Sequence, residues 1–218
     1  MALIYIKEVT DGARLGLWHM DEEPEQLLDR YPHLRRLEIP YKNATRQREF
    51  LCVRALLHEM TGDDTLQIDH EESGRPVVNG WLVSISHTRG YAVLMLAPSS
   101  LLPPPSTLHP QAVGVDIEYR SDRIAKIASH FIRPDESSLL PPSPEAVEQM
   151  LVLWCAKETL YKLHSEDNLH YFDMRSQGMQ LSSDGGTLTL ENLKRGEQVT
   201  IHVALTPEYC LTWAVENP

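Results

Sequence analysis

The stretch VGVDIEY, residues 113–119, combines the pattern of a β-strand with two acidic side chains. Its odd-numbered positions are apolar, and Gly114, Asp116 and Glu118 alternate with them. This period of two predicts a strand with one apolar face and a second face that presents both carboxylates. Because like charges repel, the pair predicts a partner elsewhere in the chain that compensates the negative charge.

The downstream segment PEAVEQMLVLWCAKETLYKLH, residues 144–164, has the period of an amphipathic helix. Its expected apolar stripe contains Val147, Met150, Leu151, Trp154 and Tyr161. Glu158 occupies the stripe position between Trp154 and Tyr161. A carboxylate facing a core is costly unless it is paired, protonated or bound to a metal. An ion pair with Lys162, four residues further on, is the ordinary explanation, but it leaves Lys157 and the strand carboxylates unexplained.

Asp116, Glu118 and Glu158 together offer three carboxylates from two separate elements. Mg²⁺ prefers hard oxygen ligands and takes few of them from protein. A shared Mg²⁺ ion would relieve both the repulsion on the strand and the cost of the helix carboxylate. The alternative is that the strand pair merely faces solvent, and the helix carboxylate with its flanking lysines weakens that alternative.

The strand and the helix also resemble a known family. GVDIE at 114–118 and WCAKETLYK at 154–162 are similar to the paired signature of the 4′-phosphopantetheinyl transferase superfamily. Thr159 stands where alanine is usual, which exchanges one small residue for another. The combination is much more specific than either motif alone.

The first half of the chain extends the resemblance. SGRP at 73–76 and SISHT at 84–88 are similar to two further family motifs, and RQREFLCVRALL at 46–57 resembles the basic helix upstream of them. The length matches the larger single-chain type, similar to surfactin-synthetase activators. Ser84 and Thr88 depart from the usual residues, and the Gly-Lys-Gly common after the second motif is absent from residues 163–175, which leaves carrier recognition open.

The resemblance implies an enzyme that moves the phosphopantetheine arm of coenzyme A onto a serine of an apo acyl or peptidyl carrier protein and releases 3′,5′-ADP. It implies that Asp116, Glu118 and Glu158 hold Mg²⁺ against the coenzyme A diphosphate. Glu158 would also be the candidate general base for the serine, and the sequence does not separate its two roles. Lys162 would stabilise the leaving group, and Lys157 would help to bind the diphosphate.

The resemblance further implies coenzyme A contacts in the first half, at Arg54, Arg75, Ser86 and His87. Arg54 lies near the apolar stripe of its predicted helix, where an arginine is less easily solvated. His87 taken alone would be read as an ordinary turn histidine. Arg46 and Arg48 are weaker candidates, because arginines in the first turn of a helix often face solvent.

The order of predicted elements indicates an α+β fold with a pseudo-two-fold arrangement of two similar halves, each with helices packed on a mainly antiparallel sheet. The Pro- and Ser-rich segment 98–110 separates a half at 1–110, expected to contact the nucleotide, from a half at 111–218, expected to hold Mg²⁺. Helices are predicted at 24–37, 44–60, 123–131 and 145–164. Strands are predicted at 3–9 and 13–20, and hairpins at 81–97, 184–186 and 206–208.

The composition excludes several classes of protein. The formal net charge of −11 argues against a general nucleic-acid binder, and no apolar run is long enough for a membrane span. Cys52, Cys155 and Cys210 lack the spacing of a zinc site and predict buried free thiols in a reducing cytoplasm. His58-Glu59-Met60-Thr61-Gly62 fails the HExxH pattern of zinc proteases at its last position.

Two other functions remain as alternatives. One is a non-catalytic protein that binds coenzyme A or a carrier protein, although such a protein would not need a base. The other is a different Mg²⁺-dependent phosphotransferase, which the lack of a GxxxxGK(S/T) loop disfavours. The internal likeness of the halves favours a monomer, and residues 131–150 are the expected carrier docking surface.

Overall fold

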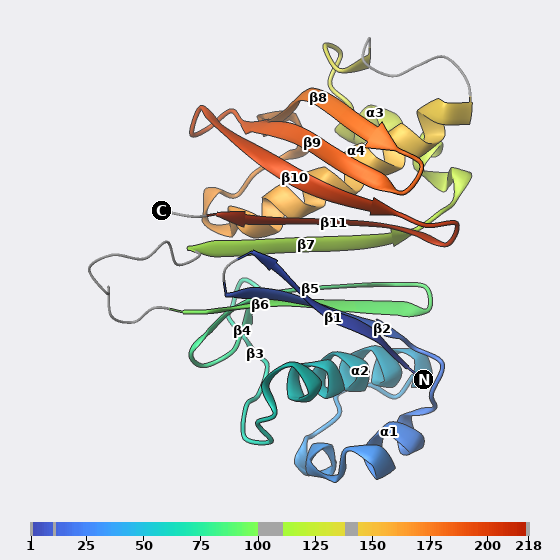
Figure 1. The fold of residues 1–218 in the computed structure, drawn as a ribbon, viewed down its shortest axis with the longest axis vertical. Coiled ribbons are helices and arrows are strands. Elements are labelled where there is room, and N and C mark those ends of the chain that lie inside the picture. Colours follow the sequence, from blue (N-terminus) through green and yellow to red (C-terminus); the bar gives the residue numbers. More distant parts are fainter. Residues whose placement is uncertain (1, 11, 100–110, 138–143, 217–218) are drawn as a thin grey trace. The chain divides into compact units, whose positions relative to one another are not determined.

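The computed structural model describes residues 2–10, 12–99, 111–137 and 144–216. These residues divide into two compact units at the boundary between Gln111 and Ala112. Each unit combines helices with an antiparallel sheet (Figure 1), which confirms the α+β class; the two-fold relation between the halves stays a prediction. Most of the predicted linker, residues 100–110, and residues 138–143 of the expected docking surface lie outside the described residues.

The first unit contains a four-stranded sheet in the order β1-β2-β6-β5 and a separate pair of short strands, β3 and β4. Its strands are β1 (Leu3–Thr10), β2 (Ala13–His19), β3 (Asp69–His70), β4 (Pro76–Val77), β5 (Trp81–Thr88) and β6 (Tyr91–Pro98). Its helical segments are α1 (Pro24–Arg30), the 3₁₀ helix η1 (Pro32–Arg36) and α2 (Ala44–Thr61). Helix α2 packs on β2 and β6, and α1 packs on α2.

Local sequence signals set the ends of these elements. The Asn43 side chain accepts hydrogen bonds from the backbone N–H groups of Thr45 and Arg46 and so caps α2. Gly62 ends the helix in the left-handed region, at φ 71°. Gly90, at φ 80°, lies in the two-residue turn between β5 and β6. The predicted helix at 44–60 and the hairpin at 81–97 are therefore confirmed.

Two of the predicted helices are each broken into shorter pieces. The helix expected at 24–37 ends at Arg30, and η1 begins at Pro32, because a proline inside a helix removes a hydrogen bond and clashes with the preceding turn. The helix expected at 123–131 is a 3₁₀ helix, η2 (Asp122–Lys126), followed by the short α3 (Ala128–Phe131). Both predictions were wrong about continuity, although both segments are helical.

The second unit contains a five-stranded antiparallel sheet in the order β7-β11-β10-β9-β8. Its strands are β7 (Ala112–Tyr119), β8 (Met174–Ser182), β9 (Gly185–Asn192), β10 (Glu197–Leu205) and β11 (Tyr209–Glu216). Besides η2 and α3 it has α4 (Pro144–Leu163) and the 3₁₀ helices η4 (Ser165–Asp167) and η5 (Tyr171–Asp173). Helix α4 packs mainly on β7 and β11, and the two predicted hairpins join β8 to β9 and β10 to β11.

The strand that precedes the main helix is built alike in the two units. β2 pairs with β6, and β7 pairs with β11. In each unit this strand therefore lies beside the strand of its sheet that comes last in the chain. Each carries a glycine against the helix. A Cβ atom on Gly16 would lie 2.7 Å from Cδ1 of Leu56, and one on Gly114 would lie 2.5 Å from the carbonyl oxygen of Thr159.

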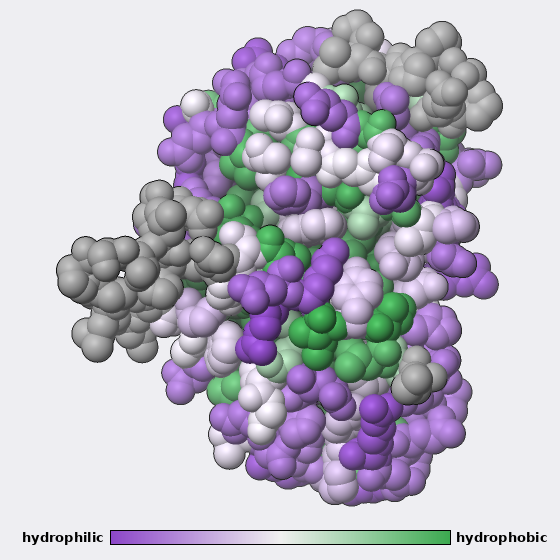
Figure 2. Space-filling model, in the orientation of Figure 1, coloured by the Kyte–Doolittle hydropathy of each residue, from purple (hydrophilic) through white to green (hydrophobic). Residues whose placement is uncertain are grey.

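The helices of the first unit present a polar surface (Figure 2). On the face shown in Figure 2, the helical layer of the first unit is mostly hydrophilic. Within the described ranges, none of the helices combines the length and the apolar content that crossing a membrane requires. Cys52, Cys155 and Cys210 are buried free thiols, as predicted.

We expect Gly114→Ala to lower the free energy of unfolding by about 1–3 kcal/mol, because the added methyl group meets backbone that cannot move alone. Gly16→Ala is the matched control, since it meets the ends of the flexible Leu56 and Met60 side chains and should cost less. Urea unfolding followed by circular dichroism measures both. A Gly114→Ala protein at least as stable as Gly16→Ala would contradict this account of the packing.

Candidate functional site

The face of β7 with the two carboxylates lies against helix α4. The close approach at Gly114 brings the strand onto the last turns of the helix, near Thr159 and Leu163. Asp116 and Glu118 follow on the same strand face because of the period of two. The absence of a side chain at Gly114 therefore serves the packing of the strand against the helix.

Asp116 is almost fully buried, with 4% of its surface exposed. Its Oδ1 accepts a hydrogen bond from Lys162 Nζ at 2.8 Å, and its Oδ2 lies 3.1 Å from Cys155 Sγ, the donor in that contact. Burial raises the pKa of the Cys155 thiol, which keeps it protonated. The same Lys162 donates to the carbonyl oxygen of Val115 at 3.0 Å. The ion pair that the sequence suggested between Lys162 and Glu158 is thus replaced by one with the strand.

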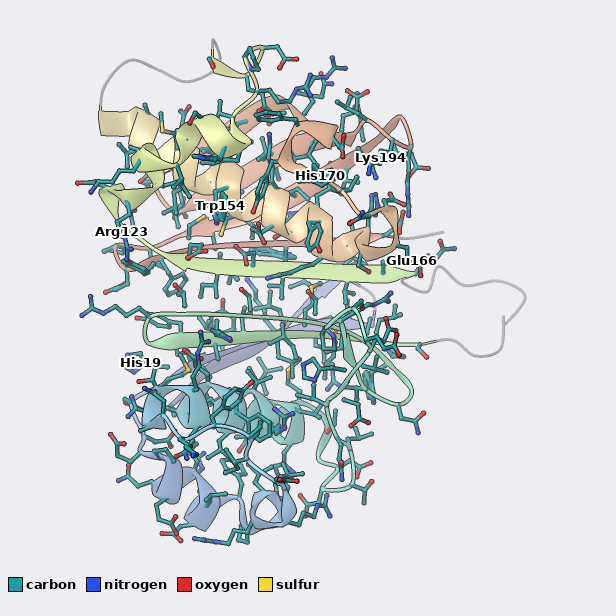
Figure 3. All side chains as sticks on the ribbon, turned by 180° about the vertical axis from the view of Figure 1, so that it is seen from behind. His19, Arg123, Trp154, Glu166, His170 and Lys194 are labelled. Carbon is teal, nitrogen blue, oxygen red and sulfur yellow. The ribbon has the colours of Figure 1, made fainter. Side chains whose placement is uncertain are left out.

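Glu118 is held by the indole of Trp154, which projects from the middle of α4 (Figure 3). Trp154 Nε1 donates to Glu118 Oε1 at 3.2 Å. The indole ring lies between Phe131 and Tyr171, with ring centroids 5.2 and 5.0 Å away. This packing fixes the tryptophan, so the tryptophan in turn orients the second strand carboxylate.

Glu158 is half-buried on α4 and accepts a hydrogen bond from the Tyr171 hydroxyl at 2.6 Å. Burial raises the pKa of Glu158, and the charge of Asp116 adds to that rise. Tyr171 and Lys162 oppose it. A half-buried carboxylate with a raised pKa is better suited to accept a proton than a solvated one.

The three carboxylates fit a hard cation by their chemistry. All are oxygen donors, two come from one strand face, and the third comes from the helix that covers that face. Each carboxylate is held by its own hydrogen-bond donor. Their oxygen atoms do not all lie within 4.8 Å of one another, the separation that marks candidate metal groups among the described residues. A cation would therefore have to draw them together in competition with Lys162, Trp154 and Tyr171.

Lys157 points into the interior of the second unit. Its side chain is fully buried and donates to Glu136 Oε2 at 2.8 Å and to the carbonyl oxygens of Phe131 and Tyr171 at 2.7 and 3.2 Å. These three acceptors match the three N–H donors of an ammonium group. Burial lowers the pKa of Lys157, and Glu136 opposes that shift. These contacts favour a structural role for Lys157, and its role in diphosphate binding stays a prediction.

The first unit has an open pocket with an empty volume of about 480 Å³. It brings together three residues that the sequence singled out separately, Arg46, Arg54 and His87. Glu49 also lines it, with Oε1 3.8 Å from His87 Nδ1 and Oε2 2.8 Å from Arg46 Nη1. The cluster of basic groups is suited to an anion, and its acidic neighbour holds two of them in position.

Arg54 is the most constrained of these basic groups. Its guanidinium donates to the carbonyl oxygens of Phe50 and Ile68 at 3.1 and 3.0 Å and lies 3.4 Å from the centroid of the Phe50 ring. Burial lowers the pKa of Arg54 to about 10, which leaves it cationic at neutral pH. A partly desolvated cation of this kind attracts an anion more strongly than a solvated one.

The remaining predicted contacts lie elsewhere. Ser86 lies next to His87 on β5 and therefore on the opposite face of the sheet. Arg75 lies in the turn that joins β3 to β4, where its carbonyl oxygen accepts a hydrogen bond from Glu71 N. Arg48 makes a surface ion pair with Glu23 at 2.8 Å. The structure does not bring these three into the pocket.

Sequence reasoning missed two residues that hold the site together. Tyr171, the partner of Glu158, lies in the segment where the family pattern breaks off, so no motif marked it. Glu136, the partner of Lys157, lies in a segment that was read only as a docking surface. A buried lysine requires a buried acid, and that requirement was the only signal available for Glu136.

Comparison with known proteins supports the reading of the second unit. The family model described as the 4′-phosphopantetheinyl transferase superfamily matches residues 112–214. No curated protein matches the chain significantly.

We expect Lys157→Met to lower the free energy of unfolding by about 3–5 kcal/mol, because it leaves the Glu136 carboxylate buried without its cation. Adding Glu136→Gln should recover part of that loss. Arg48→Met, which breaks an ion pair at the surface, is the control and should cost less than about 1 kcal/mol. Urea denaturation measures all three. A Lys157→Met protein as stable as Arg48→Met but with weaker coenzyme A binding would restore the ligand role.

Proposed function

Residues 112–214 belong to the 4′-phosphopantetheinyl transferase superfamily, and from this we propose that the protein transfers the phosphopantetheine arm of coenzyme A to a serine of an apo acyl or peptidyl carrier protein. Membership of the family supports phosphopantetheinyl transfer in general. The observation that carries the proposal is that, within the matched region, Asp116 and Glu118 on β7 contact Lys162 and Trp154 of the helix that carries Glu158. We further propose that the protein is the larger single-chain type.

In the proposed reaction, the serine oxygen attacks the phosphorus atom attached to pantetheine. The bond from that phosphorus to the oxygen of the leaving group breaks, and 3′,5′-ADP departs with the electron pair. Glu158 takes the proton of the serine, and its half-buried position with a raised pKa supports this role. Tyr171 holds the carboxylate in one orientation during the transfer.

Lys162 and the strand carboxylates would act on the negative charge of the diphosphate and of the departing ADP. Asp116, Glu118 and Glu158 are the residues that would hold Mg²⁺, which when bound neutralises charge on the diphosphate. Lys162, which donates to Asp116 on this strand face, is the cation that would stabilise the negative charge on the departing ADP. The buried ion pair of Lys157 with Glu136 anchors α4 to the segment that follows α3 and takes no part in the chemistry.

We propose that the pocket lined by Arg46, Arg54 and His87 receives phosphate groups of coenzyme A. Its residues supply two guanidinium groups and an imidazole, and such donors bind phosphates. Arg75, Ser86 and Arg48 lie outside the pocket, and we retain them only as weaker candidates. Exposed Tyr161 and Phe172 lie near the Glu158–Tyr171 pair in the sequence and offer apolar surface for a carrier protein.

The direct test is mass spectrometry of an apo carrier protein incubated with coenzyme A, Mg²⁺ and this protein. We expect the carrier to gain one phosphopantetheine group. Glu158→Gln should slow transfer by about 10²–10⁴-fold, because an amide cannot accept the serine proton, and it should keep coenzyme A binding. Glu166→Gln, an exposed carboxylate, is the control. No gain across several carriers, with coenzyme A still bound, would favour a binding protein instead.

A second prediction concerns the 3′-phosphate of coenzyme A. We expect His87→Ala to raise the KM for coenzyme A roughly tenfold and to leave kcat unchanged, because it removes one charge-assisted hydrogen bond. The same variant should no longer distinguish coenzyme A from dephospho-coenzyme A, which lacks that phosphate. His130→Ala, at an exposed histidine of the other unit, is the control. A variant that kept the preference would remove His87 from the phosphate contacts.

A further inference from the structure

Two histidines and an aspartate meet in the first unit, far along the chain from the β7 carboxylates. His33 lies on η1, His58 near the end of α2, and Asp64 in the loop that follows α2. The ligand atoms of the three side chains all lie within 4.8 Å of one another. His33 Nδ1 is 3.2 Å and His58 Nδ1 is 2.8 Å from the same oxygen, Asp64 Oδ1.

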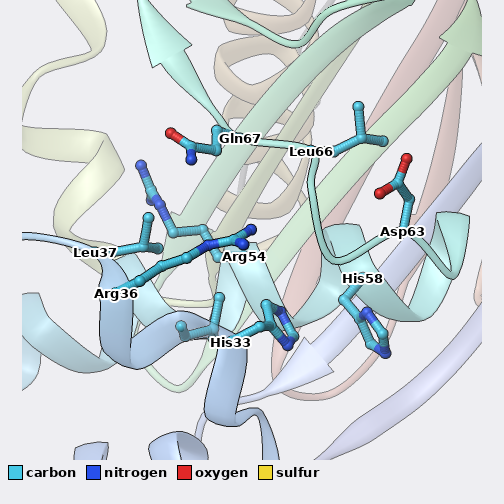
Figure 4. Close-up of a pocket in the computed structure, with 9 residues that line it drawn as sticks. His33, Arg36, Leu37, Arg54, His58, Asp63, Leu66 and Gln67 are labelled. Atoms are coloured by element: carbon cyan, nitrogen blue, oxygen red, sulfur yellow. The ribbon is translucent and has the colours of Figure 1, made fainter.

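Ordinary hydrogen bonding does not account for this cluster. His58 Nδ1 is buried and makes no hydrogen bond, despite its short distance to Asp64 Oδ1. A buried polar atom without a hydrogen bond is costly. The two imidazole rings lie side by side, with centroids 4.8 Å apart and planes at 39° (Figure 4). Two ring nitrogens thus approach one carboxylate oxygen, and at least one of them approaches in a direction unsuited to a hydrogen bond.

We propose that His33, His58 and Asp64 bind a zinc ion. Imidazole and carboxylate are ligands that Zn²⁺ takes in proteins, and Mg²⁺ avoids nitrogen ligands. In a tetrahedral zinc site, ligand atoms lie about 3.3 Å apart, close to the separations seen here. Three protein ligands leave a fourth position for water. The failed HExxH pattern at His58 excludes a helix-borne pair of ligands, and the fold supplies the partners from η1 and the loop instead.

The surroundings of the cluster favour a cation only in part. Arg36 donates to the carbonyl oxygen of Asp64, which fixes the loop backbone but brings a positive charge nearby. Arg36 and Arg54 also line the shallow pocket beside the two histidines (Figure 4). The Asp64 carboxylate offsets one such charge, so we expect a site of moderate affinity. Because it joins η1 to α2, a bound ion would stabilise the first unit.

A second cluster of similar composition provides a contrast. His164, Glu197 and Glu216 also have ligand atoms within 4.8 Å of one another. There, however, Arg195 Nη1 already lies 3.4 Å from Glu216 Oε1 and 3.7 Å from Glu197 Oε2. The guanidinium occupies the place that a metal ion would need, so we expect no zinc at this cluster.

The test is equilibrium dialysis of the full chain against Zn²⁺ in excess Mg²⁺, which occupies any site of hard oxygen ligands. We expect one Zn²⁺ per chain. Asp64→Asn should weaken binding by more than about tenfold, the smallest loss typical of residues that only hold a metal ligand in place. The Asp64 side chain is exposed, so the fold does not depend on it. His58→Ala should do the same, and circular dichroism checks that it folds. Glu197→Gln and His130→Ala are the matched controls and should bind as the unmodified chain does.

Thermal unfolding supplies a second readout. At one fixed Zn²⁺ concentration, the Tm of the unmodified chain and of Glu197→Gln should rise, and that of Asp64→Asn should rise by less. No Zn²⁺ bound in excess Mg²⁺ would overturn the proposal. So would equal Zn²⁺ affinity in Asp64→Asn, or loss of binding in Glu197→Gln alone. None of these outcomes depends on transferase activity, so the zinc site and the proposed function can fail separately.

Discussion

The close approach of β7 to α4 at Gly114 is the constraint on which the candidate site depends. A side chain at this position would collide with the carbonyl oxygen of Thr159, so only glycine lets the strand lie against the last turns of the helix. That contact puts Asp116 within reach of Lys162 and Cys155 and Glu118 within reach of Trp154. The strand face with the two carboxylates is therefore turned toward the helix. Hydrogen-bond donors from α4 offset the repulsion between the two carboxylates.

The first unit uses the same packing for a different purpose. Gly16 faces Leu56 and Met60, as Gly114 faces Thr159 and Leu163. When the two helices are aligned on these contacts, Arg54 occupies the position of Lys157. Both residues are cations that donate to main-chain carbonyl oxygens. On the strands, the position of Asp116 is taken in the first unit by Trp18, which is fully buried in the core.

The shared register explains why the acidic site occurs in the second unit. At this position the first unit has an apolar side chain where the second has a carboxylate. The likeness seen here is limited to a glycine that lets a strand approach a helix, because the two sheets differ in strand order.

The sequence predicted the strand and the helix that carry the three carboxylates, because alternation and helical period are local patterns. The role of the carboxylates as metal ligands stays a prediction. The sequence misjudged the face of α4. The expected stripe through Trp154 and Glu158 is the half-buried edge of the helix, and it ends at the exposed Tyr161. The middle of α4 is buried nearly all round, down to Lys157, so a helical period could not identify the side that faces the sheet.

Partners brought from distant segments were beyond the sequence. Glu136 and Tyr171 complete the environments of Lys157 and Glu158, and neither belongs to a motif. The breaks within the predicted helices at 24–37 and 123–131 also went unpredicted, although Pro32 signalled the first of them.

The most direct measurement of the central claim is anomalous diffraction from crystals grown with coenzyme A and Mn²⁺ in place of Mg²⁺. We predict an anomalous peak bounded by carboxylate oxygens of Asp116, Glu118 and Glu158, with Lys162 no longer bonded to Asp116. A peak that lies away from these three carboxylates, or none at all in crystals that contain coenzyme A, would contradict it.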